Sequence, residues 1–303
     1  MNAPTIVFAY NRPKHLQQTL SALAQNEGAA QTELFVFIDG PKTEREKSVQ
    51  CEVEQTARRF EASFQRLSIT VSPRNKGLAR SIIGGVTDII GRYERVIVAE
   101  DDAVAAPGFL RFMNEALDYY QNDASVWSIG GYTVPVALPA DYRFDVIKTQ
   151  RSSSYAWATW KTRWDKIDWD VSDYRAFRRS ITMRRGFNHW GNDRAGMLDS
   201  QMVGAVNSWA IRFDYAMFKH HMYNIVPVQS LIKNIGHDGS GTHSTVAAKN
   251  DVFAVDTGDA PKAFRLADVD ADERIRRSFC KPFYLPPFFR VKQYIKHCVF
   301  RSR

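Results

Sequence analysis

Cysteine is scarce in this chain, and the three that occur are far apart. Cys51, Cys280 and Cys298 form no closely spaced pair in 303 residues. Disulfide frameworks of small secreted proteins and structural zinc sites both need clustered cysteines. Both classes are therefore excluded, and we expect reduced thiols.

Long apolar runs are also missing. None approaches the roughly 18 residues of a membrane span, and residues 1–11 lack the basic and apolar regions of a signal peptide. We therefore expect a cytoplasmic protein. Its composition, 44% hydrophobic and 24% charged, excludes a disordered chain.

Two nucleotide-binding motifs are absent. The chain has no GxGxxG after its first β-rich run and no GxxxxGK[ST] anywhere. These absences disfavour dinucleotide cofactors and P-loop chemistry.

Acidic residues are absent from residues 274–303, which hold six arginines and three lysines. The formal charge of the whole chain is +8, so the surplus lies in this tail and the body is close to neutral. A basic total alone does not indicate nucleic-acid binding, and we expect no nucleic-acid partner.

Four β-rich runs are present in the first hundred residues, at 5–10, 33–38, 67–71 and 95–99. Their near-continuous apolar character is typical of central parallel strands. Helical patterns at 13–24, 43–64 and 78–93 separate them. This alternation predicts an α/β fold with a mostly parallel sheet.

Three carboxylates, Glu100, Asp101 and Asp102, follow the fourth run directly. Ligands of such sheets bind beyond the carboxyl ends of the strands. Crowded acids there indicate a divalent cation on a diphosphate. The alternative is a solvated acidic turn before a helix at residues 107–120.

The ordered series Ile6 to Arg12, Phe37 to Gly40, Asn75 to Gly77 and Val96 to Asp102 resembles GT-A glycosyltransferases. The closer resemblance is to N-acetylglucosaminyltransferase I and to bacterial, family 2-like surface-polysaccharide enzymes. It implies a Rossmann-like sheet flanked by helices, with an α+β acceptor side. Residues 1–125 would bind the nucleotide sugar and 126–245 the acceptor, whereas 246–303 would form a linker or lid and a basic aromatic tail.

The resemblance also implies donor-site roles for residues after the strands. Asp102 would hold Mn2+ or Mg2+, and Glu100 and Asp101 would contact ribose or sugar. Arg12 would contact the phosphates and Asp39 the base.

Four further residues complete the predicted donor site. Asn75 belongs to the resembling series, and Lys76 and Arg80 could add positive charge at the phosphates. His243 would be a second metal ligand, since a late histidine often completes this site in GT-A enzymes; a solvated loop histidine is the alternative.

The catalytic base is less defined. Asn207 occupies the position of a proposed basic aspartate in the animal enzymes, but an amide cannot accept a proton at neutral pH. Asp199 and Asp214 are the nearby alternatives, with nothing in the sequence to separate them.

Tryptophans are dense in the second half. Trp157, Trp160 and Trp164 would share one face of a helix, which indicates packing, although aromatic rings also stack on sugars. Trp209, beside the acceptor motif, is the candidate for acceptor binding.

The basic tail, residues 274–303, interleaves cations with aromatic residues. This pattern is typical of a peripheral contact with an anionic membrane, here the inner face of the plasma membrane. Alternatively, the aromatic side chains pack on the body.

The resulting hypothesis is a metal-dependent, inverting hexosyl- or N-acetylhexosaminyl-transferase of bacterial surface polysaccharide synthesis. It would move sugar from a nucleotide donor, UDP being favoured by the resemblance, to a glycan or lipid-linked acceptor. The alternatives are a sugar-phosphate nucleotidyltransferase and a non-enzymatic module that binds anionic ligands.

Overall fold

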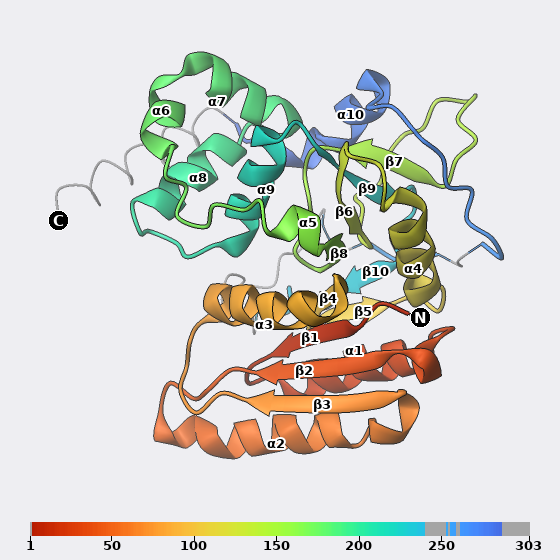
Figure 1. The fold of residues 1–303 in the computed structure, drawn as a ribbon, viewed down its shortest axis with the longest axis vertical. Helices are drawn as coiled ribbons and strands as arrows, with labels where there is room; N and C mark the ends of the chain where they lie inside the picture. Colours follow the sequence, from red (N-terminus) through yellow and green to blue (C-terminus); the bar gives the residue numbers. More distant parts are fainter. Residues whose placement is uncertain (1, 240–252, 254, 259–260, 287–303) are drawn as a thin grey trace.

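The computed structural model describes residues 2–239, 253, 255–258 and 261–286 (Figure 1). The first half alternates strands and helices: β1 (Thr5–Ala9), α1 (Pro13–Ala24), β2 (Glu33–Ile38), α2 (Lys47–Arg58), β3 (Arg66–Val71), α3 (Leu78–Tyr93), β4 (Arg95–Glu100), β5 (Ala103–Ala105) and α4 (Phe109–Tyr120). The second half comprises β6 (Val126–Gly130), β7 (Val146–Thr149), β8 (Ala156–Trp160), α5 (Lys161–Trp164), α6 (Tyr174–Arg179), α7 (Ile181–Phe187), α8 (Arg194–Met202), α9 (Trp209–Lys219), β9 (Tyr223–Pro227), β10 (Ile232–Asn234) and α10 (Glu273–Phe279).

One eight-stranded sheet joins the two halves, in the order β3-β2-β1-β4-β8-β6-β9-β7. The pairs β2–β3, β1–β2, β1–β4 and β6–β9 are parallel, whereas β8 lies antiparallel between β4 and β6. A two-stranded sheet pairs β10 with β5. This architecture confirms the predicted α/β fold with a mostly parallel sheet flanked by helices.

The two faces of the sheet are covered by different helices. Along β1, Val7 and Ala9 pack into the core beneath α1, α2 and α4, and the alternating residues Ile6 and Phe8 pack against α3 and α9. Side chains of a strand point alternately to its two faces, so a strand covered on both sides must be apolar throughout. This explains the continuous apolar character of β1 and of Val96 to Ala99 in β4.

The strand order changes direction beside β1. Its neighbours are β2 on one side and β4 on the other, so the loops that follow β1 and β4 leave the sheet in opposite directions. A crevice for ligands forms at such a point, outside the carboxyl ends of the strands.

Three local predictions are wrong. β3 is an edge strand with an exposed start and end, not a central strand. The helix expected at 43–64 is shorter, because a 3-10 turn at Glu44–Glu46 precedes α2 and a second at Glu61–Ser63 follows it. Trp157 and Trp160 lie in the strand β8 and not in a helix.

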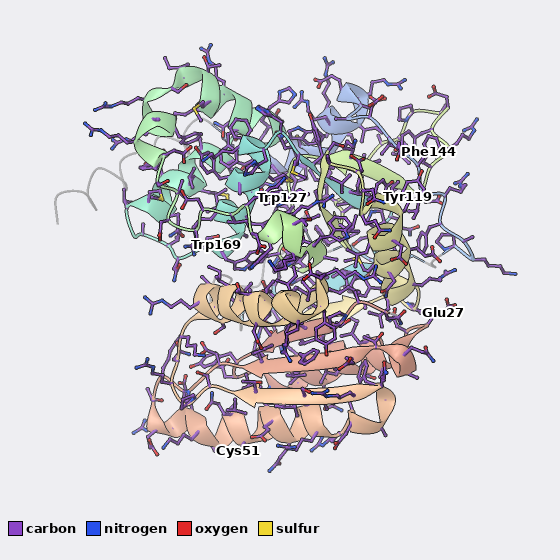
Figure 2. All side chains as sticks on the ribbon, in the orientation of Figure 1. Glu27, Cys51, Tyr119, Trp127, Phe144 and Trp169 are labelled. Atoms are coloured by element: carbon purple, nitrogen blue, oxygen red, sulfur yellow. The ribbon has the colours of Figure 1, made fainter. Side chains whose placement is uncertain are left out.

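The packing interpretation of the tryptophans is nevertheless confirmed for two of these three. Trp157 stacks on Trp164 of α5, with ring centroids 5.9 Å apart. Both rings are buried on the α3 and α9 side of the sheet. Figure 2 shows Trp127 in the same interior region, whereas Cys51 lies at the outer edge beside α2.

The described part of the tail, residues 274–286, is tied to the body. Acids that directly precede it neutralise its first arginines: Asp272 pairs with Arg274, and Glu273 pairs with Arg276 and Arg277. Phe279 is buried beside Trp190. For these residues the packing alternative holds, and residues 287–303 lie outside the described part of the chain.

Candidate active site

The acidic triplet and Arg12 meet at the crevice between β1 and β4. Arg12 follows β1, and its Nη2 lies 2.8 Å from Asp102 Oδ2 and also contacts Asp101 Oδ1. Asp101 and Asp102 are only 4% and 7% exposed. The structure therefore brings together four of the predicted donor-site residues, Glu100 included, from two neighbouring strands.

The electrostatics of this cluster reflect burial and an excess of acid. Burial, together with the charges of Asp102 and Asp101, raises the pKa of Glu100 well above its usual range. Burial also raises the pKa of Asp101 to about 6, against the opposing effect of Arg12. Burial alone would lower the pKa of Arg12, but the two aspartates raise it, so its charge is secure.

A short segment after β10 forms the back wall of the cluster. β10 pairs with β5, which starts directly after Asp102, so Ile235 N donates to Asp102 O at 2.9 Å. Asn234 Nδ2 donates to Asp102 Oδ1 at 3.3 Å. At Gly236 an added Cβ would lie 2.0 Å from Asp102 Oδ2, so only glycine fits there.

Asp39, after β2, organises the neighbouring loop. Its Oδ1 accepts from Lys76 N at 2.8 Å and from Gly40 N at 2.9 Å, and its Oδ2 accepts from Gly77 N at 2.9 Å. Asn75 Nδ2 in turn donates to Gly40 O at 2.8 Å. The predicted donor-site residues Asp39, Asn75 and Lys76 thus form one bonded unit.

Arg80 lies apart from this unit, exposed in the first turn of α3. The Lys76 side chain is also exposed. Both cations are free to move towards an anionic ligand at this edge. Their predicted contact with phosphates stays a prediction.

The donor set of the cluster fits a hard divalent cation. Its side-chain ligands are carboxylate oxygens, which Mn2+ and Mg2+ accept, and a single arginine opposes three acids. Among the described residues, no group of three His, Cys, Asp or Glu side chains is arranged to hold a metal ion. The chain thus supplies an incomplete set of the kind that substrate phosphates complete.

A cavity of about 280 Å³ lies in the second half of the chain. Its wall touches the carboxylate cluster, because Glu100 N donates to Tyr155 O at 3.2 Å and the Tyr155 hydroxyl contacts His237 Nε2 at 3.2 Å. Its lining is mainly aromatic and polar: Tyr132, Thr133, Val134, Arg151, Ser152, Ser153, Ser154, Tyr155, Arg194, Met197, Ala210, Ile211, Asp214, Val226, Phe253, Phe279 and Phe283.

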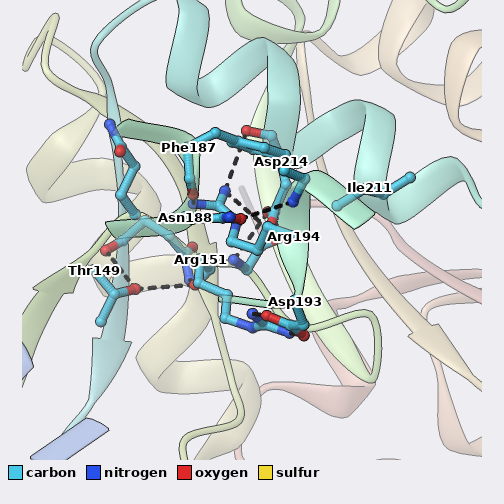
Figure 3. A network of polar contacts seen from close by, with 12 residues as sticks. Thr149, Arg151, Phe187, Asn188, Asp193, Arg194, Ile211 and Asp214 are labelled. Atoms are coloured by element: carbon cyan, nitrogen blue, oxygen red, sulfur yellow. Dashed lines mark hydrogen bonds and ion pairs between the residues drawn. The ribbon is translucent and has the colours of Figure 1, made fainter. Parts of the chain in front are cut away.

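Two buried ion pairs border this cavity (Figure 3). Arg151 binds Asp193 through two contacts of 2.8 Å, and Arg194 lies 3.3 Å from Asp214. Asp214 Oδ1 also accepts from Ser152 N at 3.0 Å and from Ser152 Oγ at 2.6 Å. Burial lowers the pKa of Arg194 to about 10, although Asp214 opposes this shift.

The structure separates the three candidates for the catalytic base. Asp214 lines the cavity at 5% exposure. Asp199 is held by Arg184, at 2.9 and 2.7 Å, and by the Tyr174 hydroxyl at 2.9 Å, outside the cavity lining. Asn207 is exposed before α9, and its Oδ1 accepts from Arg212 at 3.3 Å.

Trp209 corrects the prediction of acceptor stacking. The ring is 3% exposed and stacks on Trp157, with centroids 5.0 Å apart. It therefore packs in the core and presents no face to a sugar. The predicted metal ligand His243 lies outside the described residues.

The sequence profile described as "Glycosyl transferase family 2" matches residues 5–186, which is more than half of the chain. The match spans the whole carboxylate cluster and the first walls of the cavity. The chain belongs to glycosyltransferase family 2. Its fold is the GT-A fold, as the resemblance implied.

Crystal structures of S. aureus TarS are similar to this family 2 chain. TarS 1-349 has 12% identity and a TM-score of 0.46, over 77% of this chain and 60% of that one. A complex of TarS 1-349 with UDP has 15% identity and a TM-score of 0.36, over 48% and 39%. A further TarS structure has 16% identity and a TM-score of 0.35, over 47% and 23%. The chain spans less than two thirds of each of these proteins.

Membership of the family decides between the three functional hypotheses. It favours the glycosyltransferase over the nucleotidyltransferase and over the non-enzymatic module. None of the helices formed by the described residues has the length and apolar character to cross a bilayer.

The sequence interpretation missed several residues that shape this glycosyltransferase site. Gly236 and Asn234 reach Asp102 only through the β5–β10 pairing, about 130 positions away along the chain. The motif at 230–243 was noted, but its contact with Asp102 has no local signal. Arg151 and Asp193 carried none either, because ion pairs between distant residues leave no spacing pattern.

Proposed function

We propose that the chain is a metal-dependent glycosyltransferase that moves a hexosyl or N-acetylhexosaminyl group from a nucleotide donor to a glycan or lipid-linked acceptor. The observation that carries this proposal is the buried cluster of Arg12, Asp101 and Asp102 at the β1–β4 crevice, beside a cavity of its own. Surface polysaccharide synthesis is the proposed context, through the resemblance alone.

The donor would bind along the carboxyl ends of β1, β2 and β4. Asp39 Oδ2 accepts one backbone amide, so a lone pair remains for an N–H of the base. Arg12 lies where its guanidinium can turn from the aspartates to the diphosphate, a favourable geometry for arginine. UDP is the nucleotide that we test first.

Asp102 would hold the cation, together with phosphate oxygens of the donor. A divalent cation there neutralises charge on the leaving diphosphate. Asn234 and Ile235 fix the orientation of Asp102, and Gly236 leaves room beside its Oδ2. The chain's own residues therefore preorganise the ligand oxygen, which is where electrostatic catalysis gains most.

The cavity would receive the acceptor, and Asp214 is the proposed base. Its carboxylate is the one among the three candidates that lines the cavity, and Ser152 and Arg194 hold it in place. It would take the proton of the attacking hydroxyl in a single in-line displacement, which inverts the anomeric centre.

Nucleotide binding tests the donor site. We expect calorimetry to show binding of UDP that tightens at least tenfold with Mn2+ and exceeds that of GDP and CDP. Asp102→Ala should remove the Mn2+ dependence and reduce turnover of UDP-sugar at least 100-fold. Persistence of metal-linked turnover in this variant would contradict the metal assignment.

Asp214→Asn tests the base. We expect kcat to fall 100-fold or more, the range of general base catalysis, with nucleotide binding unchanged. Asp199→Asn is the matched control and should retain kcat within a few fold. Equal losses in the two variants would reject Asp214, and a thermal melt verifies that each variant is folded. NMR of the anomeric proton in the product reports inversion.

A further inference from the structure

A second cationic surface lies in the acceptor half, distinct from the tail. The α6–α7 hairpin, residues 174–187, contains five arginines and no acid. In Figure 1 it forms one corner of the molecule, at the opposite end from α2. Neither the donor site nor the cavity uses these arginines.

The inner face of the hairpin is apolar and fixed. Phe177 and Phe187 are fully buried, with ring centroids 5.7 Å apart. Both contact Tyr215 of α9, at 5.0 and 5.5 Å. The paired Arg184 and Asp199 join α7 to α8. The hairpin is therefore a rigid part of the body, and its outer residues have a defined position.

The outer face is cationic and unneutralised. Arg175, Arg178, Arg179 and Arg185 are exposed, and none of them forms an ion pair with a described residue. A shallow hollow is lined by Tyr174 and three of these arginines, Arg175, Arg178 and Arg179. Four free guanidinium groups around a hollow match oxyanions such as phosphate.

An apolar side chain projects from the same face. Ile181, at the start of α7, is 68% exposed, more than any other large hydrophobic side chain in the described part of the chain. It directly follows Arg179 and Ser180 and precedes Arg184 and Arg185 in sequence. Exposing it to water costs free energy that insertion between lipid chains would recover.

We propose that the α6–α7 hairpin docks on an anionic phospholipid surface, with its arginines on headgroup phosphates and Ile181 inserted among the acyl chains. A dissolved polyanion would satisfy the arginines but would leave Ile181 in water. The joint presence of the two features selects the bilayer.

The position of the hairpin relative to the cavity adds a consequence, which rests on the proposed function. The chain continues from α7 through a 3-10 turn, Asn188–Trp190, into α8, whose Arg194 and Met197 line the cavity. Docking of the hairpin would therefore hold the acceptor cavity beside the membrane, where a lipid-linked acceptor would be located.

Vesicle sedimentation of the full chain tests this surface. At about 0.15 M salt we compare phosphatidylcholine vesicles with vesicles that contain 30% phosphatidylglycerol. Each basic residue near such a surface changes the partition coefficient about fivefold. The variant Arg175→Gln, Arg178→Gln, Arg179→Gln, Arg185→Gln should therefore lose at least tenfold in binding to the anionic vesicles.

A matched control separates docking from net charge. Arg45→Gln, Arg58→Gln, Arg59→Gln, Arg66→Gln removes the same charge from exposed positions around α2 and β3 and should retain binding within about threefold. Equal losses in the two variants, or no loss in the hairpin variant, would overturn the proposal.

Ile181→Ser distinguishes the bilayer from a polyanion. We expect severalfold weaker binding to anionic vesicles and unchanged binding to heparin. Unchanged vesicle binding would overturn the membrane assignment in favour of a polyanion. Nucleotide binding in solution, measured on the same variants, should stay intact. A loss of sugar transfer with intact vesicle binding would therefore count against the proposed function and not against this surface.

Discussion

Gly236 shows how one missing side chain sets the geometry of the carboxylate cluster. A Cβ at this position would meet Asp102 Oδ2 at 2.0 Å and Arg12 Nη1 at 3.0 Å. Contacts this short do not persist, so Gly236→Ala must displace the carboxylate or the guanidinium.

We therefore expect Gly236→Ala to weaken Mn2+-linked nucleotide binding about tenfold or more, as measured by calorimetry. Gly84→Ala is the control, because its Cβ would meet nothing within 4 Å. Gly84 is an exposed position of α3, and alanine there should raise the free energy of unfolding by about 0.5–1 kcal/mol. Unchanged nucleotide binding in Gly236→Ala would show that the site does not need this close approach.

Among single residues, the sequence predicted best those whose role depends on a strand end. Arg12, Asp39 and Asp102 were placed correctly at the carboxyl edge, because each directly follows an apolar run that forms a strand. Trp209 was misplaced, since an aromatic residue beside a motif has the same local pattern whether it is buried or exposed.

At the scale of the element, α10 depends on its cap. Asp272 accepts from Arg274 N at 2.7 Å and from Ile275 N at 3.4 Å, and α10 buries Ile275 and Phe279 against the body. The hydrogen bond from the Arg274 side chain lowers the pKa of Asp272 to about 2, with the backbone donors adding to this effect.

We expect Asp272→Ala to lower the free energy of unfolding by about 1 kcal/mol at pH 7. The pKa of Asp272 is depressed in the folded state, so its stabilisation is present above about pH 4 and is lost as the pH falls towards 2. Urea titrations at pH 7 and pH 3 should therefore show a smaller gap between wild type and Asp272→Ala at pH 3. A gap of the same size at both values would contradict the ionised cap. Asp272→Asn, which keeps an acceptor, should lack this pH dependence.

Elements of the first half were predictable and those of the second half were not. β1, β2 and β4 are covered on both faces, and this leaves an apolar run in the sequence. β8 was mistaken for a helix, because Trp157 and Trp160 match helical spacing as well as burial in a strand. Its position between β4 and β6 depends on contacts far apart in the chain.

At the scale of the molecule, the two predicted halves share one sheet. The boundary at residues 125 and 126 falls between α4 and β6, yet β8 is bonded to β4 of the first half and to β6 of the second. The division into a donor half and an acceptor half stays a prediction about ligands, and the hydrogen bonding runs across it.

A shared sheet predicts cooperative unfolding. We expect a single calorimetric transition, with calorimetric and van't Hoff enthalpies that agree, because neither half can lose its strands without exposing the core of the other. Two resolved transitions, or an enthalpy ratio well above one, would show that the halves unfold independently.

The reversed direction of β8 also bears on how such an enzyme can diversify. Because β8 runs against β4, the residues that enter β8 arrive at the same edge as the residues that leave β4. Ser153 and Ser154 thus line the cavity while lying outside every strand and helix. Substitutions at these two positions can alter which acceptor fits at little cost in stability, so acceptor preference can drift between relatives while the sheet and the donor carboxylates stay unchanged.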